Sequence, residues 1–127
     1  DPVSLNEARI SIISESMSAL TMIKRAVGSF MDSNNDKMHI KNVSKGLSDV
    51  AGAMVFLEKD DVNEMLFILE EFIKKQVVDS AAAPSQAKME AFADTISAIE
   101  YYLDTINGQG AGADEALVLA ANSIKQL

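Results

Sequence analysis

The chain has 127 residues, a length typical of one domain, and its apolar fraction of 48% predicts a globular protein rather than a disordered one. The formal net charge is −8, and no cluster of basic residues interleaves with aromatics, which argues against binding to nucleic acids or to anionic membrane surfaces. The chain contains no cysteine, which excludes disulfides and thiol chemistry, and no apolar run approaches the roughly 20 residues of a membrane-spanning helix.

A first helix is predicted near the start of the chain. Ser4 and Glu7 have the spacing of a capping box, which marks a helix beginning. Apolar residues then recur at every third or fourth position to about Met31, which predicts a helix of roughly seven turns. These residues are Ile10, Ile13, Met17, Leu20, Ile23, Val27 and Phe30. The polar run at residues 32–36 predicts a turn after this helix.

The second predicted helix, residues 40–57, has two stripes. Its core stripe has alternating spacings of three and four and consists of Ile40, Val43, Leu47, Val50, Met54 and Leu57. Beside it runs a stripe of small or uncharged residues, formed by Ser44, Ser48, Ala51 and Val55, with Gly46 and Gly52 close to it. We expect one face to pack in the core and the other to carry the function.

A third helix is predicted to begin at Asp60 and Asp61, because acidic residues suit the positive N-terminal end of a helix. It is expected to bury Val62, Met65, Leu66, Leu69, Phe72, Ile73 and Val77. Its outer face carries the pairs Glu70/Lys74 and Glu71/Lys75, which are spaced for ion pairs four residues apart. Residues 80–86 have the composition of a linker, and Pro84 prevents a continuous helix through them.

The fourth helix is predicted from about Ser85 to Asn107, with Gly108 ending it in the left-handed conformation. Its core stripe consists of Met89, Phe92, Ile96, Ile99, Leu103 and Ile106. Asp114 and Glu115 are expected to open a short fifth helix. That helix should bury Leu117, Ala120, Ile124 and Leu127.

No stretch alternates with the period of a strand, so we predict an all-α fold. Long helices joined by short turns favour an up-and-down four-helix bundle with an additional short C-terminal helix. Residues 1–127 are expected to form one domain. Because the first residue is Asp rather than Met, we expect the domain to be excised from a longer protein.

Few residues suggest chemistry. Asp32, Asn34 and Asp36 match the start of a calcium loop, but the required Gly and bidentate Glu are replaced by Lys37 and Val43, so a turn is favoured. His39 is the only histidine, which rules out histidine-based metal clusters and triads, and it is interpreted as a surface residue. The seven methionines are interpreted as core filler. We therefore expect no catalytic residue, no metal and no cofactor.

Two aromatic residues are adjacent on the fourth helix. Tyr101 and Tyr102 lie about 100° apart around it, so at most one can point fully inward. The other is expected at the edge of the bundle or in an interface.

Residues 47–58, LSDVAGAMVFLE, resemble the helix that carries the phosphorylated histidine in histidine phosphotransfer (Hpt) domains. On the family pattern L-H-x-x-K-G, Ser48 stands at the histidine, Ala51 at the lysine, and Gly52 keeps the glycine. A serine without an adjacent base is a poor nucleophile, and the lysine charge is missing. A second register places Asn42, Lys45 and Gly46 on the same pattern and also lacks the histidine.

Residues 93–103, ADTISAIEYYL, are similar to the A-D-A-I-S-x-x-E-Y-Y-L signature of N-terminal domains in the chemotaxis-type hybrid histidine kinases that govern type IV pili, and of related pilus regulators. The resemblance implies a cytoplasmic pseudo-phosphotransfer module, not itself an enzyme, in a two-component chemosensory system for twitching motility. The parent chain could then be a histidine kinase.

The resemblance also implies a protein partner, such as a response-regulator receiver domain or a chemosensory-array protein. The expected docking face is the exposed flank of the second helix, formed by Lys41, Ser44, Lys45, Ser48, Ala51, Gly52 and Val55. Two alternatives stay open. One is a structural dimerisation module, unrelated to phosphorelay, that uses Tyr101 or Tyr102 with the third helix. The other is an active phosphotransfer protein that uses His39.

Overall fold

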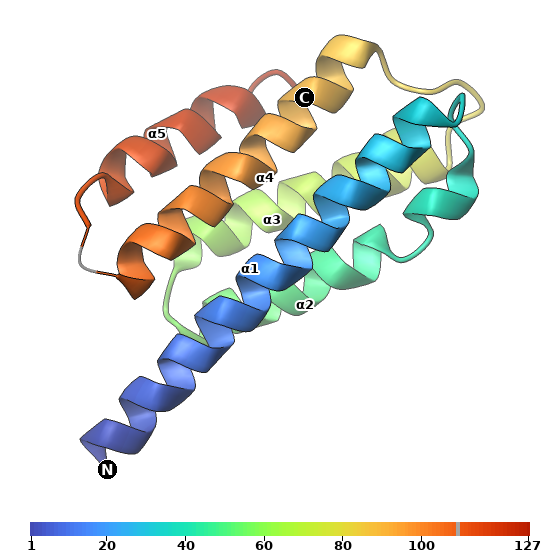
Figure 1. Cartoon of the computed structure of the whole chain (residues 1–127). Helices are drawn as coiled ribbons and strands as arrows, with labels where there is room; N and C mark the ends of the chain where they lie inside the picture. The colour runs from blue at the N-terminus through green and yellow to red at the C-terminus, as the bar shows by residue number, and fades with distance from the viewer. Residues whose placement is uncertain (109) are drawn as a thin grey trace.

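The computed structural model describes residues 1–108 and 110–127, and within them it contains helices and no strands (Figure 1). The all-α prediction is confirmed. The elements are α1 (Pro2–Asp32), the 3-10 helix η1 (Lys37–Ile40), α2 (Val43–Phe56), α3 (Asp60–Phe72), its π-helical continuation η2 (Ile73–Val78), α4 (Gln86–Asn107) and α5 (Ala113–Ile124). None of the helices in the described residues combines the length and apolar character needed to cross a membrane.

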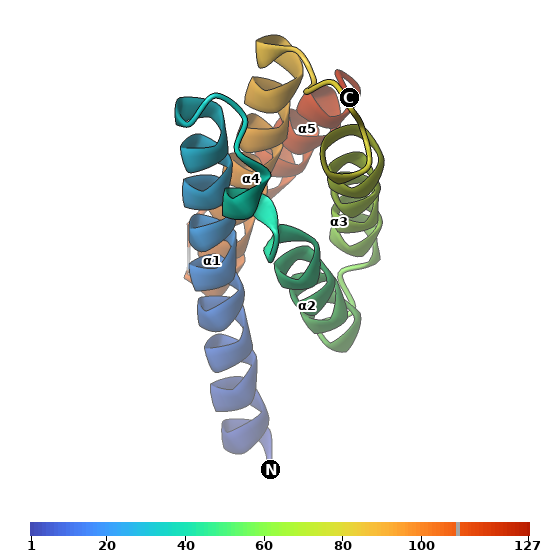
Figure 2. The same ribbon diagram turned by 90° about the vertical axis from the view of Figure 1, so that its right-hand side faces the viewer.

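The α-helices alternate in direction along the chain (Figure 1). α1 packs against α2 and α4, α2 packs against α3, and α5 packs mainly against α4. α3 also meets α5, so α3 is flanked by α2 and α5 (Figure 2). The first turns of α1 extend past the other helices, which leaves residues 1–8 exposed.

The core is built from the predicted stripes. Its largest fully buried side chains are Phe30, Phe92, Ile13, Leu20, Ile40, Leu47, Met54, Leu66, Leu69, Ile73, Ile96 and Ile99. Phe72 stacks on Phe92 with ring centroids 5.8 Å apart, which joins the end of α3 to α4. Ile10 is an exception among the predicted core residues, because it lies on the extended part of α1 and is exposed.

The predicted capping box at Ser4 and Glu7 is wrong. Asp1 caps α1 instead: its Oδ1 accepts hydrogen bonds from the backbone N–H groups of Val3 at 2.9 Å and Ser4 at 3.2 Å. Pro2 occupies the first helical position, where its missing N–H has no consequence.

Residues 40–57 do not form one helix. The chain makes the short helix η1, passes through Lys41 and Asn42, and begins α2 at Val43. Asp36 starts η1 by accepting a hydrogen bond from the N–H of Met38 at 3.0 Å. The side chain of Ile40 is still buried in the core, so the apolar spacing continues although the helix is interrupted between Ile40 and Val43.

The third helix changes from α-helical to π-helical geometry at its end. After Phe72 the backbone widens into η2, where the N–H of Asp79 bonds to the carbonyl of Lys74 at 2.9 Å. Lys37 from η1 donates to the carbonyls of Val78 and Ser80 and so satisfies the end of this segment. The predicted burial of Ile73 and Val77 is confirmed, but the segment that carries them is π-helical rather than α-helical.

The two ion pairs predicted on the outer face of α3 are confirmed. Lys74 lies 3.3 Å from Glu70, and Lys75 lies 2.9 Å from Glu71. The Lys75 ammonium lowers the pKa of Glu71, and the carboxylate in turn raises the pKa of Lys75.

The start of α4 is as predicted: Ser85 caps the helix, and its hydroxyl accepts a hydrogen bond from the N–H of Lys88. The end is at Asn107 as predicted, but Gly108 is extended rather than left-handed. The left-handed glycine is Gly112, with φ of 112°, immediately before α5.

The fifth helix buries smaller residues than expected. α5 buries Ala116 and Ala120, whereas Leu117, Ile124 and Leu127 are only half-buried. Small residues at the contact let α5 lie close to α4.

Candidate functional site

The predicted docking face is accessible to solvent. Five of its residues are exposed and two, Ser44 and Ala51, are half-buried. Val55 is the most apolar member and keeps 61% of its surface exposed. The exposed members are Lys41, Lys45, Ser48, Gly52 and Val55. The structure thus places all the predicted residues along one accessible helix and its entry.

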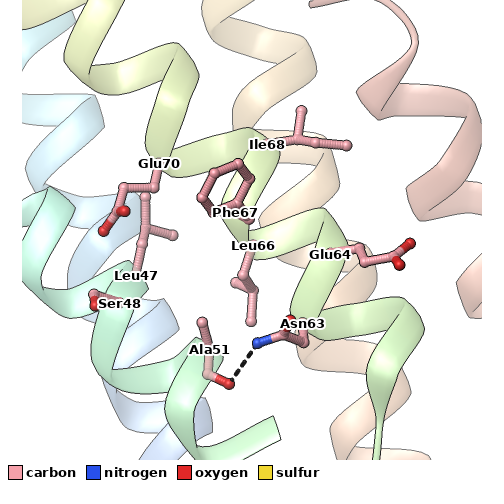
Figure 3. Close-up of a pocket in the computed structure, with 9 residues that line it drawn as sticks. All are labelled: Leu47, Ser48, Ala51, Asn63, Glu64, Leu66, Phe67, Ile68 and Glu70. Carbon is pink, nitrogen blue, oxygen red and sulfur yellow. Dashed lines mark hydrogen bonds between the residues drawn. The ribbon is translucent and has the colours of Figure 1, made fainter. Parts of the chain in front are cut away.

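A groove of about 400 Å³ runs between this flank and α3 (Figure 3). α2 contributes Leu47, Ser48 and Ala51, and α3 contributes Asn63, Glu64, Leu66, Phe67, Ile68 and Glu70. The side-chain amide of Asn63 donates a 2.9 Å hydrogen bond to the carbonyl of Ala51, which holds the two helices in register.

The residues that line the groove differ from those of a phosphotransfer site. Ser48 lines it, but the only histidine of the chain is on η1, outside the groove. The charged residues among those lining the groove are the two acids Glu64 and Glu70, which repel a phosphoryl group. The site has neither an activated nucleophile nor a cation to stabilise the transferred charge.

His39 belongs to another groove, which lies between α1 and α2 and has a volume of about 270 Å³. Asn42 and Gly46 of the alternative Hpt register also line it. Met22 forms one wall and is 68% exposed. Exposure of Met22 and Met38 corrects the interpretation of all methionines as core filler.

The two glycines of α2 have different roles. A Cβ on Gly46 would lie 3.3 Å from the side chain of Ile23, so Gly46 allows α1 and α2 to approach closely. A Cβ on Gly52 would meet nothing within 4 Å. A larger residue at Gly46 would require the side chain of Ile23 to shift, whereas the fold has no steric need for glycine at Gly52.

Residues 93–103 of α4 make polar side-chain contacts with α1. The carboxylate of Glu100 forms an ion pair with Lys24 and accepts a 2.7 Å hydrogen bond from the hydroxyl of Thr21. Lys24 also donates to the hydroxyl of Ser97. Two polar residues of the pilus-type signature therefore have structural partners on α1.

The two tyrosines divide as expected. Tyr102 is buried and Tyr101 is 52% exposed, so only Tyr101 is available to an interface. Burial, together with the charge of Asp61, raises the pKa of the Tyr102 phenol. Tyr101 lies against Gly112, where an added Cβ would be 3.0 Å from its hydroxyl.

The segment that resembled a calcium loop is a turn. Asn34 and Asn35 adopt left-handed conformations, with φ of 59° and 67°, and Asp36 caps η1. Among the described residues, no group of three or more His, Asp or Glu side chains is placed to hold a metal ion.

Two exposed residues had no role in the sequence interpretation. Phe67 and Ile68 on α3 keep 60% and 46% of their surfaces exposed and form part of the groove beside Ser48. The available signal was an excess of apolar residues outside the regular stripe of this helix.

The chain is similar to known proteins over nearly all of its length. It is 32% identical over 126 residues to scaffold protein FimL of Pseudomonas aeruginosa, an alignment that covers 97% of this chain and 22% of that relative. The chain therefore spans about a fifth of the length of the curated relative. No solved structure matches it. Residues 3–124 match the family model of the FimL C-terminal domain, and the chain belongs to that family.

Proposed function

We propose that this chain is a non-catalytic docking module of a scaffold protein, and that it binds its partner through the exposed flank of α2. The observation that carries the proposal is the accessible groove between α2 and α3, which is lined by Ser48 and Ala51, the residues that the Hpt resemblance aligns with the histidine and the lysine. The α2 side of this groove is lined by the small residues Ser48 and Ala51 together with Leu47, and the exposed Phe67 lies on the α3 side.

The scaffold role is supported by the relative, whose name describes a scaffold protein. The finer proposal is that α1 to α4 form an Hpt-like bundle to which α5 is added, and that Ser48 and Ala51 mark a former phosphotransfer site. On this proposal the domain works in the cytoplasm, in a chemosensory system controlling type IV pili. Its partner is a receiver domain or another array protein.

Gly52 supports a binding role for this flank. In the middle of an exposed helix, glycine is about 1 kcal/mol less favourable than alanine. The structure offers no steric reason for it, because the space around its Cα is open. A partner that approaches the α2 backbone closely would provide the reason.

The test is a titration of the isotope-labelled domain with a receiver domain from a type IV pilus chemosensory system. Amide shift changes are expected along the α2 flank and the facing part of α3. Ser48→Arg should weaken binding about tenfold, because the long side chain fills the groove. Ser18→Arg, at an exposed serine of α1, is the matched control and should leave affinity unchanged. Equal affinities of the two variants would contradict the docking face.

The absence of catalysis has a separate test. The domain is incubated with a radiolabelled phosphorylated receiver domain and with an autophosphorylated histidine kinase. No stable label is expected on the domain. Label on Ser48 would overturn the non-catalytic proposal, and so would label on His39 that is abolished by His39→Ala.

A further inference from the structure

A second groove lies on the other side of α3, between α3 and α5. It has a volume of about 410 Å³ and is separate from the groove beside Ser48. Its apolar wall consists of Met65 and Ile68 from α3 and Leu117, Val118, Ala121 and Ile124 from α5. Glu64 and Ile68 line both grooves.

The groove exists because α5 packs closely on α4 and only partly on α3. Ala116 and Ala120 are fully buried, whereas Val118 on the groove side keeps 59% of its surface exposed. Apolar side chains facing an open channel between two helices favour a third helix that would complete the packing.

The charge around this groove is strongly uneven. α3 and α5 begin at the same end of the molecule (Figure 1), and each has two acidic residues in its first turn. The acidic residues in or next to the first turns of these two helices are Glu58, Asp60, Asp61, Glu64, Asp114 and Glu115. The basic residues near this end are Lys59 and Arg9, which acts on Tyr102 together with Asp61 and Asp114, while Lys125 lines the groove at its other end.

We infer that the α3/α5 groove binds an amphipathic helix of a partner protein that carries basic residues at one end. Apolar residues spaced three and four apart would enter the channel, and the basic end would lie over Asp61 and Glu64. A second copy of this chain is a poor occupant because each copy has a net charge of −8. The inference concerns the α5 side of α3, which adjoins the proposed docking groove at Glu64 and Ile68 but does not include the α2 flank, and it holds whether or not that flank binds a receiver.

The probe is a synthetic helical peptide of about 18 residues, or five turns, with leucines on one face and lysines elsewhere, enriched toward one end. Binding is measured by fluorescence anisotropy and mapped by amide shifts of the isotope-labelled domain. Shift changes are expected on α3 and α5. A peptide of the same composition with a scrambled order should bind at least about tenfold more weakly, because it lacks a continuous apolar face.

Adjacent residues of α5 provide matched variants. Val118 and Leu119 are equally exposed, at 59%, but only Val118 lines the groove. Val118→Lys is expected to weaken peptide binding about tenfold, and Leu119→Lys by less than about twofold. Asp61→Lys should also weaken binding, whereas Asp94→Lys, at an exposed acid of α4, should not.

Three results would overturn the inference: equal effects of the two α5 variants, equal binding of the scrambled peptide, or shift changes confined to α2. Self-association of the domain that is lost in Val118→Lys would assign the groove to a second copy and would also overturn it. Ser48→Arg distinguishes the two proposals, because it should impair receiver binding and leave peptide binding intact.

Discussion

Glu100 shows how one polar residue connects two distant parts of the chain. Only 16% of its side-chain surface is exposed, its Oε2 accepts a hydrogen bond from Thr21, and its buried Oε1 has the ion pair with Lys24 and no hydrogen bond. A carboxylate removed from water needs such charge-assisted partners. This part of the pilus-type signature therefore contributes to helix packing, in addition to whatever role it has in binding.

Replacing Glu100 tests this contact. Glu100→Ala is expected to lower the free energy of unfolding by about 1–3 kcal/mol, because the substitution removes the acceptor for Thr21 and the partner of Lys24. Asp104→Ala, at an exposed acid one turn later on α4, should change it by less than about 0.5 kcal/mol. Urea denaturation measures both values. Similar losses in the two variants would show that the contact contributes nothing specific.

Tyr102 is expected to affect how the free energy of unfolding changes at alkaline pH. Burial raises the pKa of its phenol, so the native state keeps a proton that the unfolded chain releases near pH 10. Its contribution is fully present below the unfolded pKa and is lost as the pH rises through the native pKa. Tyr102→Phe should therefore make the decline of unfolding free energy above about pH 10 less steep. Tyr101→Phe is the control, and equal slopes for the two variants would refute the assignment to Tyr102.

At the scale of elements, α2 ends in a conformation that suits glycine but carries a glutamate. Glu58 has φ of 59°, and its N–H bonds to the carbonyl of Val55 at 3.1 Å. The next N–H, of Lys59, bonds to the carbonyl of Met54 at 2.9 Å. This is the Schellman arrangement, in which glycine avoids the strain of a Cβ.

Glu58→Gly is therefore expected to raise the free energy of unfolding by about 0.5–1 kcal/mol, the relief of left-handed strain less the added flexibility of the unfolded chain. Glu58→Ala removes the same charge but keeps the Cβ, so it should have little effect. Thermal and urea denaturation of both variants decide the matter. A gain of equal size in Glu58→Ala would mean that charge, rather than backbone conformation, is responsible.

Gly52 allows stability and binding to be separated. Gly52→Ala should stabilise α2 by about 0.5–1 kcal/mol, because alanine is the better helix former and its methyl group has room. It should also weaken receiver binding. Gly28→Ala, at an equally open position in α1, should add similar stability without affecting binding. If Gly52→Ala binds the receiver as well as Gly28→Ala does, close backbone approach at Gly52 is not required.

For the whole molecule, the two ends of the chain differ in how much they contribute to the core. Residues 1–8 extend beyond the other helices and are all exposed, whereas α5 covers a face of α4 through buried alanines. The additional helix is thus part of the core, while the first turns of α1 are not.

Truncation tests this distinction. Removing residues 1–8 should reduce the helical circular dichroism signal and change the midpoint of thermal unfolding only slightly, because no buried residue is lost. Removing residues 113–127 should broaden the transition or abolish it, because the apolar face of α4 becomes exposed. A sharp, unshifted transition without α5 would mean that the first four helices fold independently.

The sequence by itself determined the helical class, the core faces and the main turns. Apolar spacing sufficed for this because a helix at the surface of a domain buries one main face, so residues such as Leu47 and Ile99 were identified as core without knowledge of their neighbours. The exposed flank containing Ser48 and Gly52 followed from the same reasoning. Its use in docking stays a prediction.

The tertiary structure decided what depends on residues far apart in the chain. The break before Val43, the widening of the backbone after Phe72 and the partners of Glu100 involve contacts between elements that no local pattern encodes. The two grooves on either side of α3 also depend on how distant elements pack, so no local pattern predicts them. Phe67 and Ile68 acquired a role only when α2 and α5 were placed beside them, because a groove is a property of the space between helices.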